Sequence, residues 1–389
     1  MVSEPYGGKL VLSVMNEEER AKWLSEFNEL PRLEMDKRAA LDVEKIAFGA
    51  YSPLEGFMIE DEYLSVLHKE RLMNGLPWTI PIIFTPTITW VAKDTNVGEK
   101  VVLCFRGRPI AILEVEDKFT YNKRELAEQV YGVYDPCHPD VRKIQASGEI
   151  ALGGKVKLIQ PVTKLEAFRE LTPSEARGEF EKRGWSTIAA YQTRNPPHWA
   201  HEYIQRCVLE IMDGLFIHPV IGELKQGDFP PEAIIQGYMY LVEHYYPKNR
   251  VLLSPLSISM RYAGPKAAVF LAIIRKNYGC THFIVGRDIA GVRNYYEPYA
   301  AHKKLKELDI GIEPILFKES FYCKRCHIMA TEKTCGHSAK DRVEIRMTLI
   351  RDMIAQGIKP SSDVMRPEIA EILFNFREKL RCDWGEEGD

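Results

Sequence analysis

Apolar and polar residues alternate in two different ways along the chain, and the pattern changes near residue 165. Before this point, short apolar runs rich in β-branched residues are separated by turns that contain proline or glycine. The candidate runs are Thr79–Thr85, Ile88–Ala92, Lys100–Phe105 and Pro109–Val115. Short strands at this spacing predict a small mixed, β-barrel-like domain. We therefore expect residues 1–165 to form an N-terminal β-rich domain.

The next part of the chain, residues 166–320, alternates strand patterns with helix patterns after a leading helix at Ser174–Gly184. The expected strands are Thr187–Gln192, Gly214–Ile221, Val251–Pro255, Thr281–Val285 and Ile312–Phe317. The expected helices are His198–Met212, Glu232–Tyr245, Pro265–Asn277 and Tyr295–Leu308. This alternation predicts an α/β domain in which helices cover both faces of a Rossmann-like parallel sheet. Ligands of such sheets bind outside the carboxyl ends of the strands.

A third region, residues 321–389, begins with a cysteine-rich loop. Helix patterns follow at Arg342–Gln356 and Arg366–Leu380. We expect a small α-rich C-terminal domain here, and a length of 389 residues agrees with two or three domains.

The charge balance restricts the class of ligand. Lysine and arginine number 52 and aspartate and glutamate 55, so the net charge is -3 and no global nucleic-acid signature exists. An anionic ligand would need a local cluster of cations and backbone amides. No run of 18 apolar residues predicts a membrane span, and the first residues lack a signal-peptide pattern. The scattered cysteines favour reduced thiols and a cytoplasmic location.

The first candidate motif runs from Gln192 to His201, directly after an apolar strand. Asn195 can cap the following helix, which would place His198 and His201 in its first turn on one face. The free amides of a first turn favour an anion, and Arg194 offers a planar fork for phosphate or sulfate. The simpler alternative is a capped helix with two surface histidines.

The second candidate motif, Gly286-Arg-Asp-Ile-Ala-Gly291, follows the strand Thr281–Val285, again at a carboxyl end. Its glycines permit close approach of the backbone to a ligand. Arg287 can stabilise a transferring phosphoryl group, and Asp288 can orient Arg287 or help to place hydrated magnesium. The alternative is a loop with a local Arg–Asp pair.

Both motifs carry a resemblance to a known family. Gln192-Thr-Arg-Asn-Pro-Pro-His-Trp-Ala-His201 resembles the HxxH motif of the nucleotidylyltransferase superfamily, and in full it is similar to the signature of the ATP sulfurylases. Gly286–Gly291 resembles their GRDxAG motif, and Met260–Lys266 resembles their MRxAGP segment. The resemblance extends from about residue 44 to residue 380. It implies a PUA-like fold for the N-terminal domain.

The resemblance also implies an activity: sulfate attacks the α-phosphate of ATP in line, giving adenylyl sulfate and pyrophosphate, or the reverse. Sulfate would contact Gln192, Arg194 and the Ala290 amide. ATP would contact Gln192, Thr193, Arg194, Asn195, His198, His201, Gly286, Arg287 and Asp288. Arg194, Asn195, His198, His201 and Arg287 are the expected catalytic residues. Mg²⁺ would accompany ATP, and family members are often oligomeric, so a homodimer is expected.

The sequence departs from the family pattern at several positions. Trp199 and Ile289 stand where relatives carry an arginine and a histidine, respectively. Arg346 and Met347 replace part of a Ser-Gly-Thr helix start.

The cysteines near the C-terminus form a separate motif. Cys323, Cys326, Cys335 and His337 have the spacing C-x2-C-x8-C-x-H, which suits a closed tetrahedral zinc site of structural type. His327 is an alternative fourth ligand, and free thiols on a loop are the simpler interpretation.

Two other functions compete with the activity that the resemblance implies. Other HxxH nucleotidylyltransferases act on phosphorylated vitamins or sugars, but we do not expect them to combine both motifs with a large N-terminal domain. A non-catalytic RNA-binding protein would use the barrel-like domain, and the weakly acidic chain argues against it.

Overall fold

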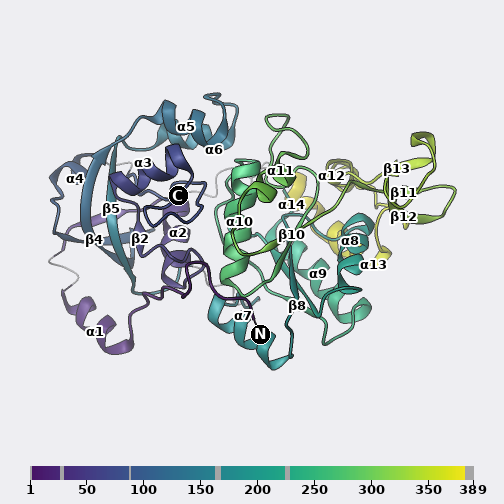
Figure 1. Cartoon of the computed structure of the whole chain (residues 1–389), viewed down its shortest axis with the longest axis horizontal. Helices are drawn as coiled ribbons and strands as arrows, with labels where there is room; N and C mark the ends of the chain where they lie inside the picture. The colour runs from purple at the N-terminus through teal and green to yellow at the C-terminus, as the bar shows by residue number, and fades with distance from the viewer. Residues whose placement is uncertain (1, 27–29, 87–88, 163–167, 224–227, 382–389) are drawn as a thin grey trace.

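The computed structural model describes residues 2–26, 30–86, 89–162, 168–223 and 228–381. Figure 1 shows two large α/β parts side by side, with a small sheet at the far end of the second part. No helix among the described residues is long and apolar enough to cross a membrane.

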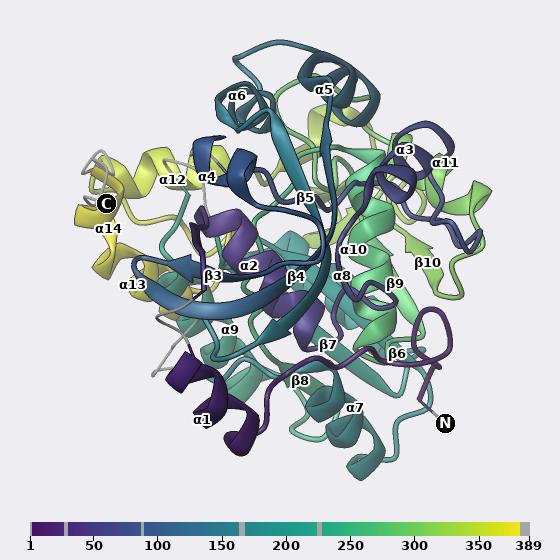
Figure 2. The ribbon, with the colours of Figure 1, turned by 90° about the vertical axis from the view of Figure 1, so that its left-hand side faces the viewer.

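The N-terminal part contains a mixed sheet of five strands in the order β1-β3-β4-β5-β2. The strands are β1 Arg32–Glu34, β2 Gly56–Phe57, β3 Lys100–Phe105, β4 Arg108–Thr120 and β5 Ile150–Leu158. β1 pairs in parallel with β3, and the other pairs are antiparallel. The surrounding helices are α1 Glu17–Glu26, α2 Lys37–Ala47, α3 Glu60–Lys69, α4 Thr89–Asp94, α5 Lys123–Tyr131 and α6 Pro139–Ala146. Figure 2 shows α5 and α6 together beyond one end of the long strands.

Two of the four expected N-terminal strands are wrong. Thr79–Thr85 contributes only an isolated bridge from Phe84 to Leu152, because Pro81 within the run has no amide proton to donate to a ladder. The segment Ile88–Ala92 overlaps α4, apart from residue 88, which lies outside the described residues. Such short apolar runs do not distinguish a strand from a helix.

The second part contains a parallel sheet of five strands in the order β10-β9-β6-β7-β8. The strands are β6 Ile188–Thr193, β7 Gly214–Pro219, β8 Val251–Leu253, β9 His282–Val285 and β10 Glu313–Leu316. The helices are α7 Pro173–Lys182, α8 Trp199–Leu209, α9 Pro231–Tyr245, α10 Pro265–Asn277 and α11 Ala300–Glu307. The predicted parallel α/β sheet is confirmed, with each strand within a few residues of its expected bounds.

Helix α10 lies at the junction of the two large parts (Figure 1). Pro265 stands at its first turn, and most of its residues are buried on every side, as expected for a helix with no solvent face. At its C-terminal end, Asn277 donates to the carbonyls of Ala50 and Ser52 and accepts from the Tyr6 amide at 2.9 Å. One apolar core contains residues from both parts. The N-terminal part is therefore fixed to the second part by shared packing.

The C-terminal region contains a small antiparallel sheet of β11 Ser320–Cys323, β12 Ile328–Thr331 and β13 Arg342–Glu344, in the order β12-β11-β13. Three helices follow: α12 Met347–Ala355, α13 Pro367–Asn375 and α14 Arg377–Arg381. The expected helix Arg342–Gln356 thus starts only at Met347, because its first residues pair with β11 as β13. Ile350 and Ile369 belong to the same apolar core as residues of α9 and of the parallel sheet, so the C-terminal region packs against the second part.

Candidate functional site

The two sequence motifs leave the parallel sheet at neighbouring strand ends. β6 pairs with both β7 and β9, and Ala190 lies opposite Phe283. The segments after Thr193 and Val285 therefore emerge at the same edge. Chain connectivity runs outward from β6 in one direction and from β9 in the other, so this edge is the topological switch point, where ligands of open α/β sheets bind.

A third segment connects the two motifs. Arg194 donates from Nη1 to the Tyr262 hydroxyl at 2.9 Å, and two residues later the Gly264 amide donates to the Ala290 carbonyl at 3.1 Å. The segment Tyr262–Gly264 thus touches both loops. The structure brings Arg194 and the Ala290 backbone to opposite ends of one three-residue segment.

The start of helix α8 differs from the predicted one, and this changes the position of the two histidines. His198 is the N-cap residue of α8, with extended backbone at φ -141, so Asn195 does not cap the helix as expected. The reason is that two consecutive prolines, Pro196 and Pro197, keep the chain extended for another turn. The rings of His198 and His201 are stacked with centroids 3.7 Å apart. The Tyr238 hydroxyl lies 3.5 Å from His201 Nδ1.

Burial keeps both imidazoles neutral. Desolvation lowers the pKa of His201 to about 4 and lowers the pKa of His198 well below its usual value, with the neighbouring His201 adding to the effect. A neutral imidazole still has one N–H to donate to a phosphate oxygen.

Two buried polar side-chain atoms of the first motif find no protein partner among the described residues. They are Gln192 Oε1 and His198 Nδ1. A buried polar atom without a partner is costly, and such atoms commonly face bound water or a ligand. Thr193 instead satisfies the turn: its hydroxyl contacts the Asn195 amide and carbonyl at 3.0 Å.

Asp228, which was not predicted from the sequence as a site residue, lies beside Arg194. Asp228 Oδ2 lies 3.6 Å from Arg194, and Oδ1 accepts from Arg351 of α12 at 2.8 Å. Its side chain is only 4% exposed. The carboxylate therefore holds two arginines of different chain regions together. Its position after the carboxyl end of β7, at the edge of the sheet where ligands bind, was the available signal.

The second motif forms a loop with unusual backbone. Asp288 and Ala290 both have positive φ, at 50 and 58, a conformation that side chains other than glycine adopt at a cost. None of the described residues accepts a hydrogen bond from the Ala290 amide. His302 Nε2 lies 3.0 Å from the Gly286 carbonyl and so braces the start of the loop. The backbone is thus held in a shape that leaves the Ala290 amide available.

Arg287 is directed to other protein groups in this structure. Its Nη1 contacts Glu319 at 2.7 Å, and its Nε lies 3.3 Å from Asp288. The Arg287 and Asp288 side chains are 39% and 52% exposed. The guanidinium does not contact Arg194 or the histidines, so the structure places only the backbone of this motif beside the first one.

Two of the residues that depart from the family pattern, Trp199 and Ile289, have structural roles. Trp199 donates from Nε1 to the Ser362 carbonyl at 2.6 Å and lies 4.6 Å from the Arg366 guanidinium. It therefore fastens the C-terminal region to α8. Ile289 packs against the large apolar core.

The cysteine motif forms a compact cluster. The ligand atoms of Cys323, Cys326, Cys335 and His337 all lie within 4.8 Å of one another, and His327 is not among them. Cys326 Sγ is 3.8 Å from Cys335 Sγ and 3.1 Å from His337 Nδ1. A tetrahedral zinc with Zn–S bonds of about 2.3 Å needs S–S separations of about 3.8 Å. The donor set and spacing therefore fit zinc, with His337 as the fourth ligand.

A separate cavity lies in the N-terminal part of the molecule. It measures about 90 Å³ and lies between α2 and α6, lined in part by Arg38, Lys143 and Arg261. These cations already pair with Asp140, Glu223 and Asp42, respectively. The lining is charge-balanced, so we place the candidate site at the edge of β6 and β9 and not in this cavity.

Comparison with known proteins gives a consistent result. A family model described as ATP-sulfurylase matches residues 168–376, and one described as a PUA-like domain matches residues 3–161, which confirms the PUA-like expectation. A sulfate adenylyltransferase of Aeropyrum pernix is 47% identical over 378 residues, covering 96% of this chain and 98% of the relative. Sulfate adenylyltransferases of Pyrococcus abyssi and of a Synechococcus species are 45% and 44% identical, covering 97% and 95% of this chain and 98% and 95% of the relatives.

One solved structure is also similar. It is described as a hexameric APS kinase from Thiobacillus denitrificans, is 25% identical and aligns with a TM-score of 0.75. The match covers 96% of this chain and 68% of that chain.

Proposed function

Because this chain belongs to the ATP-sulfurylase family, we infer that it is a sulfate adenylyltransferase, which joins sulfate to the AMP part of ATP and releases pyrophosphate, or runs the reverse reaction. The observation that carries this conclusion is the meeting of the two motif loops at the switch point between β6 and β9. The family match leaves no observation in favour of the two rival functions.

The reaction sets a mainly electrostatic task. Sulfate is fully ionised near neutral pH, so its attack on phosphorus requires no general base. The difficulty is to bring a dianion against a polyanion. Catalysis is therefore positioning plus stabilisation of negative charge by fixed cations and amides.

The sulfate side of the site is assigned to Arg194, Gln192 and the Ala290 amide. Three observations support this assignment. The guanidinium of Arg194 is fixed by Tyr262, the Gln192 amide side chain has a buried atom without a partner, and the Ala290 amide is free of described acceptors. Sulfate held there would attack the α-phosphorus in line.

The nucleotide side is assigned to the rest of the two motifs. His198 and His201, held neutral, would each donate one hydrogen bond to the departing pyrophosphate. Asn195 and Arg287 would stabilise charge on the α-phosphate. Arg287 would first exchange its contact with Glu319 for the substrate. Thr193, Gly286 and Asp288 complete the expected ATP contacts, and Mg²⁺ enters with ATP as part of the substrate.

The zinc site is assigned a structural role. Four protein ligands fill a tetrahedron and leave no open position for substrate. When bound, the metal would supply a cross-link between β11 and the loop that carries Cys335 and His337.

We also propose domain bounds, a cellular compartment and an oligomeric state. The domain bounds are 1–165, 166–320 and 321–389, although α12 and α13 share a core with α9. The described cysteines are all free thiols, which supports work in a reducing compartment such as the cytoplasm. A homodimer is the expected assembly, and sedimentation analysis tests it.

The decisive experiment mixes the purified chain with adenylyl sulfate, pyrophosphate and Mg²⁺ and measures ATP. We expect ATP to form only when both substrates are present. In the forward direction, pyrophosphate release from MgATP should depend on sulfate. If ATP does not form and sulfate does not stimulate pyrophosphate release, the assignment is wrong.

A further inference from the structure

We propose that Tyr262 is a positioning residue for the sulfate-binding Arg194, and that Asp140 of the N-terminal part fixes Tyr262 in turn. This inference rests on the proposed function, because it concerns the arginine assigned to sulfate. It gives the N-terminal part a defined task in the reaction, because this part sets the direction of one guanidinium.

The first step is the contact between Tyr262 and Arg194. The guanidinium lies over the phenol ring, with its carbon 4.8 Å from the ring centroid, and Nη1 donates to the hydroxyl at 2.9 Å. The Arg194 side chain is 18% exposed. Ring and hydroxyl together hold a long side chain that would otherwise sample many rotamers.

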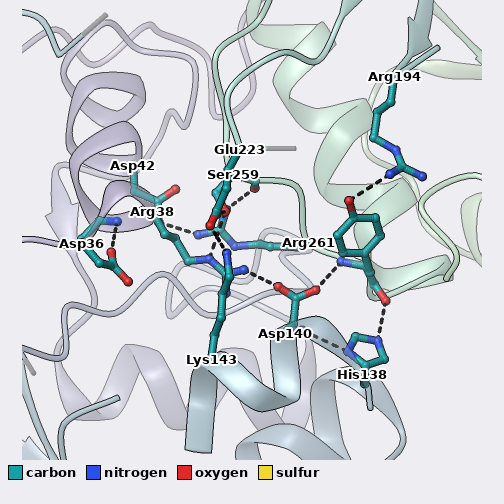
Figure 3. A network of polar contacts seen from close by, with 12 residues as sticks. Asp36, Arg38, Asp42, His138, Asp140, Lys143, Arg194, Glu223, Ser259 and Arg261 are labelled. Atoms are coloured by element: carbon teal, nitrogen blue, oxygen red, sulfur yellow. Dashed lines mark hydrogen bonds and ion pairs between the residues drawn. The ribbon is translucent and has the colours of Figure 1, made fainter. Parts of the chain in front are cut away.

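The second step is the backbone of Tyr262 itself, which is hydrogen bonded on both sides. Its amide donates to Asp140 Oδ2 at 2.7 Å. Its carbonyl accepts from the Tyr296 hydroxyl at 2.8 Å and from His138 Nε2 at 3.1 Å. His138 Nδ1 accepts from the Asp140 amide at 3.2 Å, so the ring proton belongs on Nε2. Figure 3 shows His138 and Asp140 side by side below Arg194.

The third step is the anchorage of Asp140. His138 and Asp140 belong to the first turn of α6, where His138 is the N-cap residue, and both are fully buried. Arg38 of α2 pairs with the second carboxylate oxygen of Asp140. Arg38 also donates from Nε to Ser259 Oγ at 3.1 Å, three residues before Tyr262.

A second ion pair fixes Arg261, the residue directly before Tyr262. Arg261 pairs with Asp42 of α2, and both side chains are at most 5% exposed. Figure 3 shows these groups converging from α2, α6 and the segment around Ser259. The segment that touches Arg194 is therefore held by α2 and α6 through ion pairs and hydrogen bonds.

The physical consequence concerns sulfate and not ATP. A guanidinium that is already oriented loses little freedom when a sulfate oxygen binds, so preorganisation raises affinity for that anion. Removal of the Tyr262 hydroxyl deletes one charge-assisted hydrogen bond and leaves the ring, the backbone contacts and the packing in place.

The test is the Tyr262→Phe variant, measured by sulfate-dependent pyrophosphate release. We expect the KM for sulfate to rise about tenfold while the KM for MgATP stays within about twofold. The matched control is Tyr6→Phe, which removes another buried hydroxyl, bonded to the Pro77 carbonyl at 2.6 Å, away from the site. In the control both KM values should stay unchanged.

A double-mutant cycle shows whether Tyr262 acts through Arg194. In an Arg194→Lys background, which keeps the charge but not the planar fork, Tyr262→Phe should change the sulfate KM by less than about twofold. Additive effects in this cycle would show that Tyr262 acts by another route and would overturn the proposal.

Asp140 supplies an independent arm. Asp140→Asn keeps an oxygen for the Tyr262 amide, so the KM for sulfate should stay within about threefold of the native protein, whereas Asp140→Ala should raise it about tenfold. Both variants lose the Arg38 pair, so a purely structural role would lower their thermal stability and leave the sulfate KM alike. If Asp140→Ala does not fold, the Tyr262→Phe variant decides.

If the native protein is active and Tyr262→Phe leaves the KM for sulfate unchanged, this inference alone is overturned. If the native protein has no sulfate-dependent activity, the proposed function is overturned.

Discussion

His198 and His201 lie with their rings 3.7 Å apart, stacked at the carboxyl edge of the parallel sheet. Two positive imidazolium rings at this distance would repel each other, and burial disfavours either charge. The pair is therefore neutral, as the proposed donation to phosphate oxygens requires. Because the pKa of His201 is about 4 in the folded state, this neutrality has a consequence for stability.

The first prediction is an acid-dependent loss of stability. Histidine in the unfolded chain has a pKa near 6.5. Between pH 6.5 and pH 4, His201 is therefore protonated in the unfolded chain and neutral in the folded protein. Stability from this group is complete above pH 6.5 and falls as the pH decreases through that window. We expect the native protein to lose about 2 kcal/mol more than His201→Asn between pH 7 and pH 4.5.

Urea unfolding at several pH values measures this difference. The comparison with His201→Asn removes the contribution of all other titrating groups. Parallel stability curves for the two proteins would contradict the neutral pair.

The second prediction separates chemistry from folding. Arg194→Ala should abolish sulfate-dependent pyrophosphate release, with a loss of at least about a thousandfold, because the main cation for sulfate is removed. His201→Ala should likewise abolish turnover. Circular dichroism and the unfolding midpoint should show that both variants fold. The control is Arg124→Ala on α5, whose side chain is 69% exposed, and it should retain full activity.

Turnover that persists in both Arg194→Ala and His201→Ala would refute the assigned roles while leaving the family assignment intact.

The sequence predicted the parallel sheet well because local and tertiary signals agree there. Pro265–Asn277 was placed at its observed bounds, since a proline at the start and an apolar run on every face leave little choice. The helix at His198 was placed too early. The preference of Asn195 for a cap position was overridden by the two prolines that follow it.

Tyr262 and Asp140 illustrate what the sequence does not reveal. They are 122 positions apart, and their contact depends on how α6 meets the second part of the molecule. No periodicity or spacing encodes such a contact. Arg287 was selected from its motif, yet its partner in the structure is Glu319, 32 positions away.

The third prediction concerns the metal. The purified protein should contain about one zinc per chain, and His337→Ala should lose it, because His337 Nδ1 lies 3.1 Å to 3.5 Å from the three sulfurs. His327→Ala is the matched control and should retain zinc. Elemental analysis after gel filtration measures both. Zinc retained in His337→Ala and lost in His327→Ala would reverse the ligand assignment.

Metal removal should also lower stability. β11 carries Cys323, and α8 packs against β11 and β12, so zinc in the Cys/His cluster would brace the helix that starts at the histidine pair. We expect a chelator to lower the unfolding midpoint by roughly 5 °C or more. An unchanged midpoint in the zinc-free protein would mean that the cluster bears no structural load.

The last prediction concerns the fastening of the C-terminal helices to α8. Arg366 contacts both oxygens of Glu202, at 2.8 Å and 2.5 Å, and its guanidinium lies 3.5 Å from the ring centroid of Tyr245. Glu202 is only 5% exposed, so Arg366→Ala removes the bidentate partner of a buried carboxylate and leaves it the contact with Arg206 Nε at 2.8 Å. We expect the free energy of unfolding in urea to fall by about 3 kcal/mol, and Arg366→Lys should recover only part of this loss.

The control is Lys359→Ala, which breaks the exposed pair with Glu371 and should cost less than about 1 kcal/mol. Equal losses in Arg366→Ala and Lys359→Ala would show that the Glu202 contact is no stronger than a surface ion pair.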